Sequence, residues 1–150
     1  MSLDVLDPRS PRAGERSLAS TLVPSRPASR LLAVGLGVGA KTVTGRARYV
    51  ARPQDLDALQ PGEILMAEET APAWEPALAR AAGVVVNRGD EASHAALAAR
   101  RLGLPAVVAA HDGASPLWTG AVITLVAGAD GSGRIYQELA HPAARDLLRA

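Results

Sequence analysis

Short apolar segments that alternate with helical segments are the feature that most limits the fold of this chain. Seven segments rich in Val, Leu, Ile and Ala have the length and composition of strands. Helical segments between them end at glycine or at a Pro-Gly pair. This order predicts a layered α/β domain. The expected strands are 31–38, 43–50, 63–67, 84–87, 106–109, 121–126 and 134–136, and the expected helical segments are 54–59, 74–82 and 93–102.

The two ends of the chain differ from this central region. Residues 1–29 are rich in Pro, Arg, Ser and Ala without an apolar period, which predicts a flexible linker or a vector-derived extension. The folded domain is expected over 30–140, and 141–150 is expected to be a closing helix or the start of another linker. The apolar run at 31–40 has about half the length of a membrane span. We therefore expect a soluble, cytoplasmic protein.

Composition excludes several classes of function. The chain contains no cysteine, which rules out disulfides, zinc ribbons, iron–sulfur clusters and thiol catalysis. Its three histidines, His94, His111 and His141, lack metal-ligand spacing, so no metal site is predicted. The net charge is only +1 and aromatic residues make up 3% of the sequence, which argues against nucleic-acid binding.

Three glycines near the start of the domain do not form a nucleotide-binding loop. Gly35, Gly37 and Gly39 have the spacing G-x-G-x-G rather than G-x-G-x-x-G. They are also not followed by the strand, turn and helix that a dinucleotide site needs. No dinucleotide is therefore predicted as a ligand.

His94 is the most informative histidine, because it closes the segment Asn-Arg-Gly-Asp-Glu-Ala-Ser-His after a buried strand. Ser93 is a candidate N-cap, which places His94 in the first turn of a helix. The helix dipole and free amides at that end favour an anion and disfavour a charged imidazole. A neutral, nucleophilic histidine is expected there, in a position that suits a phosphoryl carrier. The alternative is a histidine at a helix start without a chemical role.

The segment around His94 resembles a known family. Residues 82–108, AGVVVNRGDEASHAALAARRLGLPAVV, resemble the phosphohistidine (swivelling) domain of phosphoenolpyruvate-utilising enzymes, most of all phosphoenolpyruvate synthase (pyruvate, water dikinase). The family reads roughly A-x-x-[IV]-V-T-N-R-G-G-x-T-[CS]-H-A-A-I-x-A-R-E-L-G-I-P-A-V-V-G. The resemblance extends over about 31–139, including TAPAWEP at 70–76 and GRIY at 133–136. It implies a single α/β domain of the swivelling β/β/α phosphohistidine type.

The resemblance also implies a function. In such enzymes an ATP-grasp domain phosphorylates the histidine, and a TIM-barrel domain passes the phosphoryl group to pyruvate. The chain would then be a phosphotransferase domain that is not active alone. It would bind no cofactor itself, with Mg²⁺ and ATP in the partner domains. Its expected partners are the ATP-grasp and phosphoenolpyruvate/pyruvate-binding domains of the parent protein or of partner chains, with no nucleic acid and no membrane.

Individual site residues follow from the same resemblance. His94 corresponds to the phosphorylated histidine. The expected phosphate-binding residues are Arg88, Gly89, Ser93 and Arg100, and no metal ligand is expected. The alternative for Arg100 is a solvated cation on the helix surface.

Several polar positions depart from the family pattern. Asp90 replaces the second glycine of Gly-Gly and Glu91 follows it, and two carboxylates beside a phosphate would repel it. The other departures are Ala71 and Ala73 for aspartates, Ala92 for a threonine and Ala109 for a glycine. Two alternatives stay open: the carrier domain of an antibiotic (rifampin-type) phosphotransferase, and a diverged, non-catalytic swivelling domain with a binding or regulatory role.

Overall fold

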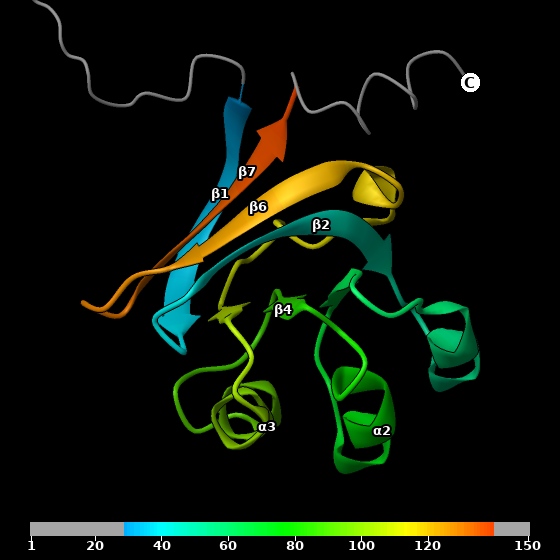
Figure 1. Ribbon diagram of the computed structural model, residues 1–150. Coiled ribbons are helices and arrows are strands. Elements are labelled where there is room, and N and C mark those ends of the chain that lie inside the picture. The colour runs from blue at the N-terminus through cyan, green and yellow to red at the C-terminus, as the bar shows by residue number, and fades with distance from the viewer. Residues whose placement is uncertain (1–28, 140–150) are drawn as a thin grey trace, which may run out of the picture. The chain divides into compact units, whose positions relative to one another are not determined.

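The computed structural model of the protein describes residues 29–139 (Figure 1). The predicted linker and the predicted C-terminal helix lie outside the described residues, except for Ser29, which begins the first strand. Seven strands of the described part form a closed barrel in the order β1-β5-β4-β3-β2-β6-β7. The strands are β1 (Ser29–Val38), β2 (Thr42–Tyr49), β3 (Ile64–Ala67), β4 (Gly83–Val86), β5 (Ala106–Val108), β6 (Val122–Ala127) and β7 (Ser132–Glu138).

The predicted mixed α/β domain is confirmed, and each of the seven expected strands is present. The helical elements are η1 (Pro53–Ala58), η2 (Pro72–Trp74), α2 (Glu75–Leu78), α3 (His94–Leu102) and η3 (Pro116–Trp118), where η denotes a 3-10 helix. No helix among residues 29–139 is long and apolar enough to span a membrane.

Strands β2 to β5 run parallel to one another, and the pairs β1–β5, β2–β6 and β6–β7 are antiparallel. Parallel neighbours need crossover connections, so η2 and α2 connect β3 to β4, and α3 connects β4 to β5. Figure 1 shows α2 and α3 next to each other on one side of the barrel. The loops that leave the carboxyl ends of β3 and β4 therefore meet at one edge of the sheet.

The central strands are apolar on both faces, as the sequence of β3 and β4 predicts. Leu65 and Val84 pack toward the helices, while Ile64, Met66 and Val85 pack inside the barrel. Four buried alanines on α3 let the helix approach the sheet closely: Ala95, Ala96, Ala98 and Ala99. This close packing fixes where α3 begins.

The helix predicted at 74–82 is shorter than expected. A 3-10 turn precedes it, and α2 comprises only Glu75–Leu78. The cause is a strand contact, because the amide of Ala82 donates to the carbonyl of Glu63 at 2.8 Å and draws the chain into the sheet ahead of β4. The predicted helical turn at 54–59 is the 3-10 helix η1.

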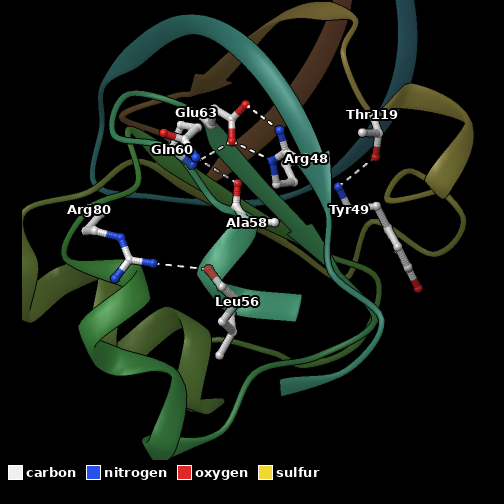
Figure 2. A network of polar contacts seen from close by, with 8 residues as sticks. All are labelled: Arg48, Tyr49, Leu56, Ala58, Gln60, Glu63, Arg80 and Thr119. Atoms are coloured by element: carbon white, nitrogen blue, oxygen red, sulfur yellow. Dashed lines mark hydrogen bonds and ion pairs between the residues drawn. The ribbon is translucent and has the colours of Figure 1, made fainter. Parts of the chain in front are cut away.

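A part-buried ion pair ties β2 to the start of β3 (Figure 2). Arg48 donates to Glu63 through Nε at 2.7 Å and through Nη2 at 3.2 Å. The backbone amide of Gln60 donates to the same carboxylate at 2.8 Å. Burial opposes ionisation of Glu63, but these hydrogen bonds outweigh it and hold the pKa of Glu63 below its ordinary value.

Replacement of Glu63 by Gln should lower the free energy of unfolding by about 1–2 kcal/mol at neutral pH. A lowered pKa stabilises the fold above the unfolded value of about 4.3, and this contribution is lost as the pH falls through the folded pKa. The difference between Glu63→Gln and the parent should therefore shrink below about pH 4 in urea unfolding measured across the acid range. The control is Asp55→Asn, because Asp55 pairs with Arg52 at 3.4 Å on the surface and should contribute little. A Glu63→Gln deficit that does not change with pH would contradict this prediction.

Candidate functional site

The candidate site is built around His94, the first residue of α3. Ser93 occupies the N-cap position as predicted, with extended backbone angles, and Gly103 ends the helix in the left-handed conformation. The expected capping contact is absent, however: the Ser93 hydroxyl donates to the carbonyl of Asp90 at 2.8 Å. The Asp90 carboxylate accepts the amide of Ala92 at 2.8 Å. These two hydrogen bonds to Asp90 close a tight turn over residues 90–93, which places His94 at the start of the helix.

Both ring nitrogens of His94 have hydrogen-bond partners. Nδ1 lies 2.8 Å from the Thr70 hydroxyl, and Nε2 lies 3.1 Å from Oε2 of Glu75. Thr70 and Glu75 belong to the β3–β4 connection, which the parallel topology places beside the start of α3. The His94 side chain is 20% exposed, so the ring is held by these contacts yet open to solvent.

Arg101 extends this group of side chains. Its guanidinium lies 2.5 Å from Oε1 of Glu75, on the oxygen that His94 does not use. The hydrogen bond from Arg101, followed by that from His94, holds the pKa of Glu75 below its ordinary value. Glu75 is thus a carboxylate at neutral pH, and a carboxylate only accepts hydrogen bonds.

A cavity of about 90 Å³ opens beside the ring of His94. It is lined by Glu69, Thr70, Val86, Arg88, Gly89, Ser93, His94 and Ala95. Its size suits a small anionic group, and it adjoins the amino-terminal end of α3, where the helix dipole favours negative charge. Position 89, beside this cavity, favours glycine over any other residue. Its φ is +103°, and an added Cβ would lie 2.8 Å from the Ser93 hydroxyl oxygen.

The structure brings most of the expected site residues together. Arg88, Gly89 and Ser93 line the cavity with His94. Arg88 also pairs with Glu68 at 3.2 Å. Arg100 is not among the lining residues, and its guanidinium donates to the carbonyl of Glu91 at 2.8 Å. Its phosphate-binding role stays a prediction.

The two carboxylates expected to repel a phosphate lie in a different hollow. Asp90 and Glu91 line a space of about 310 Å³ together with Leu36 and Ala92, and neither lines the cavity beside His94. Glu69 is the acidic residue that lines the His94 cavity. Among residues 29–139, no cluster of three or more His, Asp or Glu side chains could hold a metal ion.

Sequence analysis did not assign Thr70, Glu75 and Arg101 to the site. A signal for Arg101 was present, since it follows His94 by seven residues and therefore lies on the same face of α3. Thr70 and Glu75 follow β3, whose carboxyl end lies beside that of β4 in a parallel pair. The proximity of Thr70 and Glu75 to His94 therefore follows from the order of the strands in the sheet, which the sequence does not give.

The barrel with helices on one side, and a histidine where β4 leads into α3, defines a single swivelling domain of α/β type. The family model described as PEP-utilising enzyme, mobile domain, matches residues 59–131. The chain therefore carries the mobile domain of the PEP-utilising enzyme family.

Curated relatives agree with this assignment. Phosphoenolpyruvate synthase of Aquifex aeolicus is 40% identical over 109 residues, which cover 73% of this chain and 13% of that protein. Uncharacterized protein Mb2073c of Mycobacterium bovis is 46% identical over 89 residues, 59% of this chain and 10% of that protein. The solution structure of Enzyme I is 25% identical and covers 54% of this chain and 33% of that one, with a TM-score of 0.44. The matched region makes up only 13% and 10% of the lengths of the two curated relatives.

Proposed function

We propose that this domain is a phosphoryl carrier in which His94 accepts a phosphoryl group from one domain and donates it to an acceptor in another. The observation that carries the proposal is the position of His94 at the start of α3, beside a cavity of about 90 Å³ lined by Arg88 and Ser93. A phosphoryl group on the ring would have the helix dipole and a guanidinium within the same site.

The chemistry requires an unprotonated ring nitrogen. Its lone pair attacks phosphorus, an N–P bond forms, and the P–O bond to the leaving nucleotide breaks with the electron pair on the leaving oxygen. The reverse type of step, with an oxygen of the acceptor as the nucleophile, regenerates free imidazole. No group is oxidised or reduced in this transfer. The domain therefore contributes by orienting the ring and by placing positive charge near the phosphoryl group.

The resemblance to phosphoenolpyruvate synthases, a name that several relatives carry, favours ATP as the donor and pyruvate as the acceptor, with both bound in partner domains together with Mg²⁺. This chain spans 13% of the length of the Aquifex relative, so we assign the nucleotide and pyruvate sites to other domains or chains. Such a carrier would work in the cytoplasm, where ATP is available. The position of Asp90 and Glu91 outside the His94 cavity also favours a working carrier over a diverged one.

The test is phosphorylation of the chain in trans. The chain is incubated with ATP, Mg²⁺ and a variant of the Aquifex aeolicus synthase that lacks its own mobile domain, and its intact mass is measured. We expect one added phosphoryl group that is labile in acid and stable in alkali, and none without ATP. To exclude a failure of docking, residues 31–139 are also grafted in place of the missing domain. A graft that is never phosphorylated would contradict the proposal.

A further inference from the structure

We propose that Glu75, held in place by Arg101, is a positioning residue that keeps the ring proton of His94 on Nε2 and shields that nitrogen from phosphorylation until the carboxylate turns away. The proposal rests on the proposed carrier function of His94. It concerns how the reactivity of this histidine is controlled, which the family assignment leaves open.

The hydrogen-bond partners of the ring define its tautomer. Glu75 is ionised and can only accept, so the 3.1 Å contact to Nε2 requires a proton on that nitrogen. The Thr70 hydroxyl can donate or accept, so its 2.8 Å contact to Nδ1 is compatible with either tautomer. The Glu75 carboxylate therefore favours the Nε2–H tautomer of His94, and the Thr70 hydroxyl donates its hydrogen bond to the unprotonated Nδ1.

Arg101 fixes the carboxylate in this role. It binds Oε1 of Glu75 while His94 binds Oε2, so the carboxylate bridges a guanidinium and the ring. The side chains of Arg101 and Glu75 are 55% and 36% exposed, which leaves both room to turn. A guanidinium released from Glu75 would remain on the same helix face as His94, where a phosphoryl group on Nε2 could take the place of the carboxylate.

Phosphorylation of Nε2 requires that its proton leave first. The ring proton moves through water from Nε2 to Nδ1, and Glu75 turns toward solvent. The new Nδ1–H then donates a hydrogen bond to the Thr70 hydroxyl oxygen. The free lone pair on Nε2 then attacks the phosphorus of a nucleoside triphosphate held by the partner domain. One P–O bond breaks, one N–P bond forms, and the electron pair leaves with the nucleotide. Unless Glu75 moves, an unprotonated Nε2 would face a carboxylate, which is repulsive.

The tautomer is measured directly by two-bond ¹H–¹⁵N correlation spectra of the 150-residue chain, at a pH where the His94 ring is neutral. The His94 signals are assigned by their loss in His94→Ala. We expect the proton on Nε2 in the parent chain. In Glu75→Gln the amide can donate to an unprotonated Nε2, so the ratio of tautomers should shift by about tenfold or more toward the Nδ1–H form.

Two further variants complete the test. Arg101→Gln should shift the ratio in the same direction by a smaller factor, because Glu75 is released but still present. Asp55→Asn is the matched control, since Asp55 also pairs with an arginine, Arg52, but makes no hydrogen bond to His94 or His111, and it should not change the ratio of tautomers. A parent chain with the proton on Nδ1, or a ratio unchanged in Glu75→Gln, would overturn the proposal.

The rate of phosphorylation provides an independent check. Glu75→Ala removes the shield, so its initial rate in the trans assay should rise severalfold over the parent. A lower rate would show that Glu75 assists the reaction and would overturn the shielding role. The tautomer measurement needs no phosphoryl donor. If neither the chain nor the graft is ever phosphorylated, the carrier function is contradicted, but the NMR result still tests the pairing of Glu75 with His94.

Discussion

Replacement of His94 by Ala should abolish phosphorylation of the domain, with incorporated phosphate falling to background in the trans assay. The neighbouring hydroxyls cannot substitute, because the Thr70 hydroxyl contacts the ring that this variant removes, and the Ser93 hydroxyl donates to the carbonyl of Asp90, which is not a general base. The free energy of unfolding should fall by only about 1–2 kcal/mol, since His94 lies in the first turn of α3 and the variant loses two part-buried hydrogen bonds but no core packing.

The matched control is His111→Ala. His111 lies in the loop after β5, and the bond that it makes to the carbonyl of Asn87 comes from its backbone amide, which alanine keeps. Phosphorylation should therefore persist in His111→Ala. Retained phosphorylation in a folded His94→Ala chain would show that the phosphoryl group is carried elsewhere.

Replacement of Gly37 by Ala should be the most destabilising small substitution in the barrel, with a loss of about 3 kcal/mol or more. An added Cβ would lie 2.1 Å from the carbonyl oxygen of Ser132 and 3.1 Å from Cα of Ala127. Both are backbone atoms, so relief requires displacement of the strands themselves. The G-x-G spacing in β1, which excludes a dinucleotide loop, thus has a packing role where the barrel closes.

Gly62→Ala separates this steric effect from backbone strain. Gly62 has a φ of +88° and nothing lies within 4 Å of an added Cβ, so only conformational strain of about 1–2 kcal/mol is expected. Urea unfolding of the two variants under one set of conditions provides the comparison. Equal losses in the two variants, or a smaller loss in Gly37→Ala, would contradict the close approach of β1 to Ser132.

Local sequence signals predicted the strands and α3 well, for physical reasons. β3, β4 and β5 are continuous apolar runs, which only a strand buried on both faces accommodates at that length. Helix α3 has Ser93 before it and Gly103 after it. The limit of α2 was missed, because it depends on the long-range hydrogen bond from Ala82 to Glu63.

The site was predictable only in part. The pattern around His94 identified the histidine and its loop, since these residues are close in sequence. The arginine that reaches the ring through a carboxylate is Arg101, whereas Arg100 turns toward Glu91. The helical repeat places Arg101, and not Arg100, on the same face of α3 as His94. Glu75 comes close to both His94 and Arg101 only through the β3–β4 connection, which the sequence alone does not show. The expected repulsion of a phosphate by Asp90 stays a prediction: its carbonyl accepts the hydroxyl of Ser93, which lines the cavity, while its side chain lines the neighbouring hollow.

Ala109 shows how a departure from the family pattern acquires a physical meaning. The family has glycine at this position, and in the structure Ala109 has a φ of +56°, in the left-handed region that glycine adopts without strain. The alanine therefore retains the backbone path after β5 at a conformational cost. The framework of the site is thus kept although the side chains around it have changed.

The most direct test of the carrier function is to locate the phosphoryl group in the phosphorylated chain, by fragment-ion mass spectrometry at alkaline pH. We expect the group on His94 alone. The two hydroxyls within the same site, Thr70 and Ser93, provide the sharpest contrast, because an ester on either would survive acid whereas a phosphohistidine would not. A phosphoryl group found on Thr70, on Ser93 or outside the cavity would contradict the assignment of His94 as the carrier.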